Sequence, residues 1–146
     1  MADIPKEHLT EELLDRLLAS ASIEQYLDEG LVSARTLTDY LFDRMEAHDL
    51  RRADVVRASG LNATVVYDIF SGKSRPGRDH AIMLAFGLKC TLRETQRLLR
   101  LAGVSELWCK QRRDAIIIWC IRNGFDRIAT DDELYRMGEA TLLPAD

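Results

Sequence analysis

The amino-acid sequence is punctuated at short intervals by helix-capping residues and glycines. Asn62 opens an apolar run that stops before Gly72, and Thr91 followed three residues later by Glu94 has the form of a capping box. Cap side chains accept hydrogen bonds from the unpaired amides of a first helical turn, and glycine tolerates the left-handed conformation that ends a helix. No hairpin turn joins two runs of alternating polarity. The sequence therefore predicts an all-α protein built from short helices.

The helices expected from these signals can be placed along the chain. They are an amphipathic helix after Thr10 (Leu13, Leu14, Leu17, Leu18), one from Ser22 to Gly30, one from Thr36 to about His48, one over 52–59, one from Asn62 to Ser71, one from Arg78 to about Leu88, one over 91–102, one from Glu106 or Lys110 to Asn123, and one capped by Thr130 that ends near Gly138.

Charge is divided unevenly along the chain. Residues 1–50 contain 4 Lys or Arg and 12 Asp or Glu, residues 51–113 contain 13 and 5, and residues 114–146 contain 3 and 7. The formal net charge of -4 therefore hides a central segment of net charge +8 between acidic flanks. A basic segment attracts the phosphate backbone of nucleic acids. The alternative is that acidic and basic helices neutralise each other within one fold.

The cysteines and the longest apolar run limit the class of protein. Cys90, Cys109 and Cys120 lie among apolar residues, and their odd number without a Cys-x-x-Cys spacing argues against a disulfide framework. We therefore expect a cytoplasmic protein with buried thiols. The run from Ala115 to Ile121 has 7 residues, whereas a membrane-spanning helix needs about 20. We expect a core helix there and no membrane association.

Residues 52–71 have the pattern of two helices that cross steeply at a turn. Gly60 follows the first predicted helix, where such a turn needs a residue that tolerates positive φ. The positions that would bury the corner are Val55, Val56, Leu61, Val66 and Ile69. The positions left on the outer side of the second helix are Asn62, Ala63, Thr64, Tyr67, Asp68 and Ser71. The sequence thus predicts a helix-turn-helix corner.

This pattern resembles the phage-repressor-like (Xre/Cro-type, lambda repressor-like) helix-turn-helix family over about residues 36–102. The matching residues are Gly60-Leu61-Asn62, Val66, Ile69, Gly72, Arg75-Pro76, Leu84-Ala85 and Leu88. Two positions depart from the family: its small alanine four residues before the turn glycine is Val56, and its glutamate before the loop is Phe70. The resemblance implies a five-helix domain and a sequence-specific, DNA-binding transcriptional regulator.

By this resemblance, the helix from Asn62 to Ser71 would enter the major groove of double-stranded DNA. The residues implied for base contacts are Asn62, Thr64, Tyr67 and Asp68. Asn can bond to adenine, Thr can meet a thymine methyl group, and Asp can accept from cytosine N4. The residues implied for phosphate contacts are Arg51, Arg52, Lys73, Ser74, Arg75 and Arg78. The reading face itself contains neither Arg nor Lys.

No catalytic constellation is recognisable in the sequence. His8, His48 and His80 are separate from one another and from any nucleophile motif. The carboxylate pairs Glu11-Glu12 and Asp131-Asp132 lie at predicted helix starts, where the helix dipole favours acidic residues. We therefore expect no enzyme activity, no metal and no cofactor.

Around the predicted domain at 36–103, we expect an acidic helical extension at 1–35 and a carboxyl-terminal helical extension at 104–146. The apolar run at 115–121 needs cover on every side, which the amino-terminal helices or a second subunit in a homodimer could supply. The alternative function is a non-enzymatic protein–protein interaction or adaptor module on a helix-turn-helix scaffold. In that alternative, an acidic partner or the acidic extensions of the chain cover the basic face; cover by the chain's own extensions would be autoinhibition.

Overall fold

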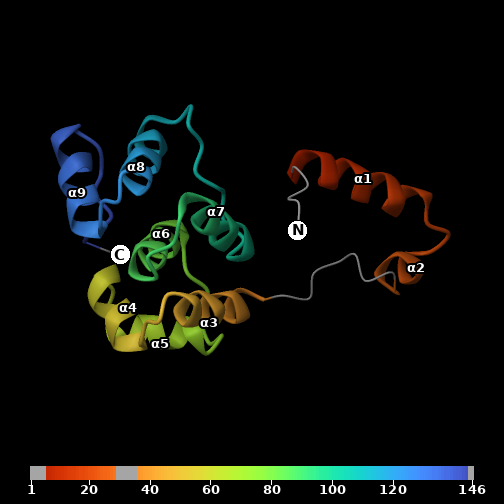
Figure 1. Ribbon diagram of the computed structural model, residues 1–146, viewed down its shortest axis with the longest axis horizontal. Helices are drawn as coiled ribbons and strands as arrows, with labels where there is room; N and C mark the ends of the chain where they lie inside the picture. Colours follow the sequence, from red (N-terminus) through yellow and green to blue (C-terminus); the bar gives the residue numbers. More distant parts are fainter. Residues whose placement is uncertain (1–5, 29–35, 145–146) are drawn as a thin grey trace. The chain divides into compact units, whose positions relative to one another are not determined.

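The computed structural model describes the backbone of residues 6–28 and 36–144 and the side chains of 11–26 and 36–144. These residues form α-helices without any strand, which confirms the all-α prediction (Figure 1). The helices are α1 (Lys6–Ala19), α2 (Ile23–Asp28), α3 (Leu37–Ala47), α4 (Arg52–Ser59), α5 (Ala63–Phe70), α6 (Arg78–Gly87), α7 (Leu92–Leu101), α8 (Arg112–Arg122) and α9 (Arg127–Arg136). The chain divides into two compact units, Met1–Arg35 and Thr36–Asp146.

The first unit contains α1 and α2. The predicted capping-box residues at the start of α2 are engaged, since the amide of Gln25 donates to Ser22 Oγ at 3.1 Å. Gln25 Oε1 in turn accepts from the amide of Ala21 at 3.0 Å. The prediction that the first helix begins after Thr10 was wrong, because α1 already begins at Lys6. The predicted helix end at Gly30 lies outside the described residues.

Three predicted caps are present in the second unit. The side chains of Thr36, Asn62 and Thr91 accept from amides in the first turns of α3, α5 and α7. Thr36 and Thr91 complete reciprocal capping boxes with Asp39 and Glu94. These caps satisfy amides that have no partner within their helices, so the amino acids that mark the helix starts in the sequence also stabilise them.

The start of α9 differs from the prediction. The predicted cap, Thr130, lies buried inside α9, and the helix begins at Arg127. Asp126 is the actual cap, since its Oδ1 accepts from the amide of Ala129 at 2.8 Å. Asp is as good an N-cap residue as Thr, and it occurs first after the glycine turn at Gly124.

The start of α8 also differs, because residues before Arg112 do not join the helix that was predicted from Glu106 or Lys110. The backbone there is bound by side chains instead. The amide of Leu107 donates to Gln96 Oε1 at 2.7 Å, and the carbonyl of Leu107 accepts from Gln96 Nε2 at 2.8 Å. The amide of Trp108 donates to Asp114 Oδ2 at 3.0 Å. Of these groups, the carbonyl of Leu107 is the one that a helix starting at Glu106 would use for its own hydrogen bonds.

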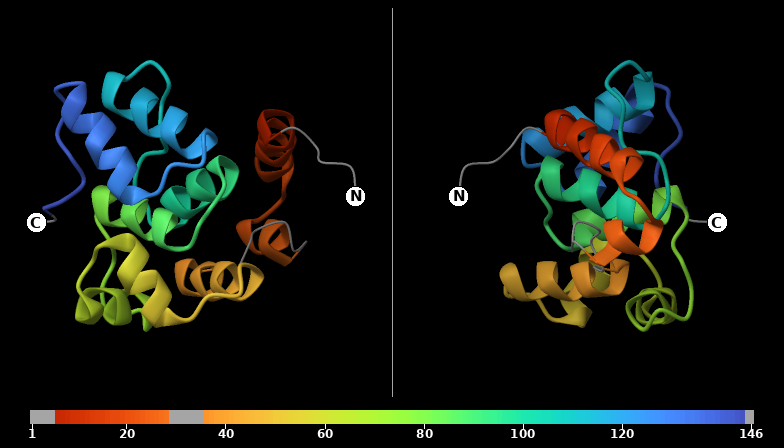
Figure 2. Two further views of the ribbon diagram at one scale, coloured as in Figure 1. Left: turned by 60° about the vertical axis from the view of Figure 1, so that its left-hand side comes forward. Right: turned by 90° about the vertical axis from the view of Figure 1, so that its right-hand side faces the viewer.

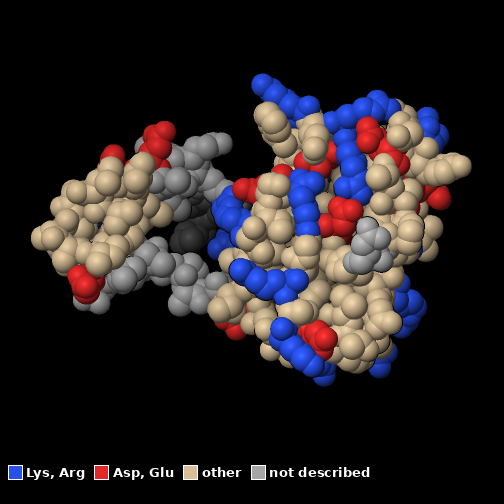
Figure 3. Space-filling model, turned by 180° about the vertical axis from the view of Figure 1, so that it is seen from behind, with Lys and Arg blue, Asp and Glu red and all other residues tan. Residues whose placement is uncertain are grey.

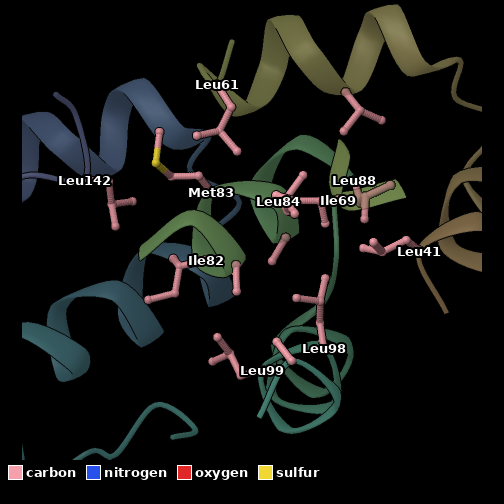
Figure 4. Packing of buried hydrophobic residues seen from close by; sticks show 14 of the residues in the cluster. Leu41, Leu61, Ile69, Ile82, Met83, Leu84, Leu88, Leu98, Leu99 and Leu142 are labelled. Carbon is pink, nitrogen blue, oxygen red and sulfur yellow. The ribbon is translucent and has the colours of Figure 1, made fainter. Parts of the chain in front are cut away.

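Helix α6 is the centre of the second unit. In Figures 1 and 2 it lies between the α4–α5 pair and the α8–α9 pair, and all residues from Ala81 to Ala85 are buried. Figure 4 shows Ile82, Met83 and Leu84 leaving α6 in different directions, toward side chains from several other helices. A helix segment that is apolar on all sides must be packed against other residues on every side. For α6, other helices of the same unit provide this packing.

Gly87 allows α4 to approach α6 closely. A Cβ atom at Gly87 would lie 2.8 Å from the carbonyl oxygen of Val55 and 2.9 Å from Cβ of Ser59. Both contacts are shorter than atoms tolerate, and one is with rigid backbone, so a residue larger than glycine would push the helices apart. The corner formed by α4 and α5 is thus set directly against the central helix.

The carboxyl-terminal residues share the core of the second unit. Leu107, Ile117, Leu134 and Leu142 are buried in the same cluster as the side chains of α6. Residues 104–144 therefore pack on the preceding helices.

Two reciprocal Arg–Asp pairs join the amino-terminal ends of α6 and α8. Arg78 Nη1 and Nη2 donate to the carboxylate of Asp114 at 3.0 and 2.6 Å. Arg113 Nη1 and Nη2 donate to the carboxylate of Asp79 at 2.9 and 3.1 Å, and this contact raises the pKa of Arg113. Arg78 also donates to the carbonyl groups of Ser105 and Glu106. Because two-pronged pairs fix both distance and orientation, they set how the two helices meet.

The expectation that all three thiols are buried was wrong for two of them. Cys120 is buried, but Cys90 is only partly buried and Cys109 is exposed. Cys109 lies in the segment before α8 whose backbone is held by other side chains, so no helix carries it into the core. Burial raises the pKa of the Cys90 thiol to about 12. Trp108 and Trp119 have exposed fractions of 62% and 53%.

Glu94 connects the end of α3 to the start of α7. Its carboxylate accepts from the amide of Thr91 at 2.9 Å, lies 3.2 Å from Nε2 of His48 and forms an ion pair with Arg44. Burial alone would raise the pKa of this carboxyl group, but these three partners together lower it below its ordinary value of 4.5.

In the described part of the chain, no helix is long and apolar enough to span a membrane.

We expect Asp114→Ala to destabilise the protein by about 3–5 kcal/mol, because it leaves the Arg78 guanidinium without its partner in a largely buried place. Urea unfolding measures this change. Glu133→Gln, which removes an exposed i,i+3 pair with Arg136, is the control and should cost less than about 1 kcal/mol. Equal costs for the two variants would contradict a central role for the Asp114 pair.

We expect Glu94→Gln to lower stability by about 1–2 kcal/mol at neutral pH, since the amide keeps an acceptor for Thr91 but loses the charge. A carboxyl group whose pKa is depressed in the folded state stabilises the fold above its unfolded pKa. This contribution is lost as the pH falls through the folded pKa. The stabilities of the two proteins should therefore converge as the pH falls below 4.5 and through the lowered folded pKa of Glu94, whereas Glu106→Gln, in an exposed pair with Arg100, should show little difference. A pH-independent difference for Glu94→Gln would contradict the ionic role.

Candidate nucleic-acid interface

A tight turn at Gly60 joins α4 to α5. Gly60 has φ of 79°, and its amide donates to the carbonyl of Val56, which closes α4. Leu61 follows it into the core, and the amide of Leu61 donates to Ser59 Oγ at 3.1 Å. Glycine adopts a positive φ at little conformational cost, which accounts for the glycine at position 60.

Helix α5 has one buried and one exposed side. Val66, Ile69 and Phe70 are buried, as the sequence pattern predicted for the first two. Of the four residues predicted to contact bases, Asn62, Thr64 and Tyr67 are exposed and Asp68 is partly buried. Asn62 Oδ1 is occupied as the cap of α5, since it accepts from the amide of Thr64 at 2.8 Å. The outer side of the first two turns of α5 is therefore exposed to solvent.

The start of α4 places arginines beside this exposed side. The guanidinium of Arg52 lies over the ring of Tyr67, with 5.2 Å from Cζ to the ring centroid. Arg51 has an exposed side-chain fraction of 89%, and its Nε is 3.8 Å from Asp54 Oδ2. The backbone amide of Arg51, more than any other group, lowers the pKa of Asp54, and the Arg51 and Arg57 charges add to this. The Arg52–Tyr67 contact brings a predicted phosphate residue and a predicted base residue together.

The loop after α5 is held by the backbone of Asp68. The amides of Lys73 and Ser74 both donate to the carbonyl oxygen of Asp68, at 2.9 and 3.2 Å. The side chains of Lys73, Ser74 and Arg75 are exposed. The loop thus presents three of the predicted phosphate-contacting side chains to solvent while its backbone is anchored to α5.

Arg78 differs from the other predicted phosphate residues. Its guanidinium is only partly exposed, and its hydrogen bonds go to Asp114, Ser105 and Glu106. The structure therefore gathers Arg51, Arg52 and the loop around α5, whereas Arg78 joins α6 to the segment before α8 and to α8 itself. Figure 3 shows one face of the protein, on which Lys and Arg side chains are spread with Asp and Glu between them.

Arg127 is a residue near this site that the sequence did not indicate. A Cβ atom at Gly60 would lie only 2.6 Å from Arg127 Nε, so this side chain packs on the turn between α4 and α5. Arg127 Nη1 donates to Asp131 at 2.7 Å, and Asp131 accepts from the amides of Leu142 and Leu143. A contact between positions so distant in sequence leaves no local pattern, so only the fold could reveal it.

Comparison of the chain with models of protein families, with curated proteins and with solved structures gives no match. The arrangement around α5 is therefore interpreted from its own geometry and chemistry.

We expect Gly60→Ala to destabilise the protein more than Gly72→Ala. Both glycines have positive φ, of 79° and 81°, and an alanine in this conformation costs about 1–2 kcal/mol. A Cβ at Gly72 would make only an ordinary contact with Thr38 at 3.7 Å, whereas a Cβ at Gly60 would collide with Arg127. Thermal or urea unfolding should show about 1–3 kcal/mol of additional loss for Gly60→Ala.

Arg127→Ala supplies the matching test of this contact. In a double-mutant cycle, the cost of Gly60→Ala should fall toward that of Gly72→Ala when Arg127 is absent. An unchanged cost would mean that Arg127 does not hold the turn.

Proposed function

We propose that the protein is a sequence-specific, double-stranded DNA-binding transcriptional regulator of the phage-repressor-like helix-turn-helix type. In this proposal α3 to α7 form the five-helix domain and α5 enters the major groove. The observation that carries it is the placement of Arg52 over Tyr67, which adds a cation to a helix face that has none in its own sequence. The test is DNA binding by the full chain.

Phosphate contacts in this proposal come from the residues around α5 with exposed charges. Arg51 and Arg52 lie at the start of α4, and Lys73 and Arg75 lie in the loop after α5. Such side chains attract the DNA backbone and fix the register of the helix in the groove. Arg78 is left out of this set because its guanidinium is bound to Asp114.

Base contacts in this proposal come from the exposed turns of α5. Thr64 offers a methyl group and a hydroxyl, and Tyr67 offers a hydroxyl and a ring over which Arg52 lies. Arginine is well suited to guanine because its two parallel N–H groups match O6 and N7. Asn62 keeps its NH₂ group as a donor while its oxygen caps the helix. The proposed reading face is thus formed by α5 together with one side chain of α4.

Exposed apolar side chains on α8 and α9 favour a second candidate, a protein-interaction or adaptor module. Trp119, Ile128 and Tyr135 are all more than half exposed. The same surface is compatible with a homodimer of the proposed regulator, in which two copies bind two half-sites. Sedimentation as a monomer at micromolar concentration would remove the dimer from the proposal.

We expect the full chain to bind random duplex DNA in fluorescence anisotropy and to lose affinity steeply between about 50 and 200 mM salt. Arg75→Ala should weaken binding to every sequence alike and reduce the slope of log affinity against log salt by about 1. Tyr67→Ala and Arg52→Ala should instead change the sequences enriched by selection from a randomised duplex.

Arg136→Ala is the control, because this exposed arginine on α9 lies outside the proposed interface and should leave binding unchanged. Absence of binding at low salt would reject the DNA-binding proposal and favour the interaction module.

A further inference from the structure

The connection between α8 and α9 borders a cavity of about 560 Å³ against the carboxyl-terminal ends of α4 and α6. Its lining comes from four helices, α4, α6, α8 and α9, and from the connections after α6 and α8. Cavities of about 300–1,000 Å³ are typical of small-molecule sites. The size is therefore suited to a small organic ligand.

Apolar side chains form much of the cavity wall. Phe86, Ile121, Phe125 and Ile128 line it, and Ile128 remains 61% exposed. Trp119 packs edge-on against Phe125, with ring centroids 5.3 Å apart, which fixes the aromatic side of the wall. Leaving such surface in contact with water is unfavourable, so an apolar ligand body would gain free energy by covering it.

The polar part of the lining is positively charged. Lys89, Arg57 and Arg127 line the cavity, and Asp126 supplies the sole carboxylate among the lining residues. Arg57 also pairs with Asp54 and Arg127 with Asp131, both outside the lining. The carboxylate of Asp126 is occupied as the cap of α9, since its Oδ1 accepts from Ala129. The lining therefore favours an anionic group over a cationic one.

The start of α9 adds donors to this charge. The amides of Arg127 and Ile128 belong to the first helical turn, where the helix itself offers no acceptor and the dipole favours an anion. The Arg127 side chain is 11% exposed, its Nη1 pairs with Asp131, and its buried Nε lies against Gly60. Positive charge, the start of α9 and an apolar wall thus border one cavity.

We propose that this cavity binds a small organic anion with an apolar body. The anionic group lies at the start of α9 near Lys89, and the apolar body lies against Phe86 and Phe125. No covalent step is involved, and the site uses none of the residues of the proposed DNA interface.

The position of the cavity connects it to the turn between α4 and α5. Arg57 and Ala58 line the cavity three and two residues before Gly60, and Arg127 packs on Gly60 itself. A ligand that alters the position of Arg127 would change the geometry of this turn. If the proposed function holds, the anion therefore acts as an effector, and DNA and the anion change each other's affinity by the same factor.

A titration of the ¹⁵N-labelled full chain by NMR tests the site, with octanoate as the anionic probe and octanol as its neutral counterpart. We expect saturable shifts at the amides of residues 124–128 and 89–91 at millimolar octanoate. Octanol should bind about tenfold more weakly, because it lacks the charge-assisted bonds. Ile128→Glu should abolish octanoate binding by placing a negative charge at the start of α9. Tyr135→Glu, an exposed position on the same helix outside the cavity lining, should bind octanoate like the parent protein.

Three results would overturn the proposal: no saturable shifts around the cavity, equal affinity for octanoate and octanol, or undiminished octanoate binding by Ile128→Glu. The titration contains no DNA, so its failure would not bear on DNA binding. Conversely, octanoate binding by a chain that fails to bind DNA would leave the anion site in place and reject the proposed function alone.

Discussion

The reciprocal pairs between Arg78 and Asp114 and between Arg113 and Asp79 hold the second unit in its observed arrangement. Each guanidinium reaches across from one helix start to a carboxylate at the other, so α6 and α8 are fixed in both distance and direction. With α8 in place, α9 follows through a short turn, and Arg127 at its start reaches Gly60. The turn that orients α5 therefore depends on an ionic junction formed by different helices.

Local signals predicted most of this fold because they act within one helical turn. The caps at Thr36, Asn62 and Thr91 and the stop at Gly60 need only their own neighbours, so the sequence pattern located those helix boundaries. The start of α9 was misplaced where two capping residues, Asp126 and Thr130, followed each other closely. The late start of α8 depends on Gln96, which is distant in sequence and carries no helix-breaking signal.

The candidate site shows the same division between local and distant effects. The exposed side of α5 followed from periodicity alone, and its residues are exposed as the pattern predicted, except for Asp68, which is partly buried. Arg78 is bound to Asp114, and Arg127 packs on Gly60. Both contacts depend on carboxyl-terminal residues, whose position no local sequence pattern predicts. The count of charges left two alternatives open, nucleic-acid binding by the basic centre or neutralisation by acidic groups within the fold, and the fold places several of these basic residues in ion pairs.

The stacking of Arg52 on Tyr67 changes how the proposed reading face would work. A guanidinium held over an aromatic ring has already lost part of its conformational freedom, so its later ordering by DNA costs less free energy. The same contact makes the two side chains interdependent, because the ring orients the cation and the cation covers the ring. One guanidinium cannot hold a phosphate in the backbone and read a guanine edge with the same N–H groups. In the proposed complex, the orientation of Tyr67 therefore decides which of the two partners Arg52 contacts, and the sequence-based separation of phosphate residues from base residues does not apply to this pair.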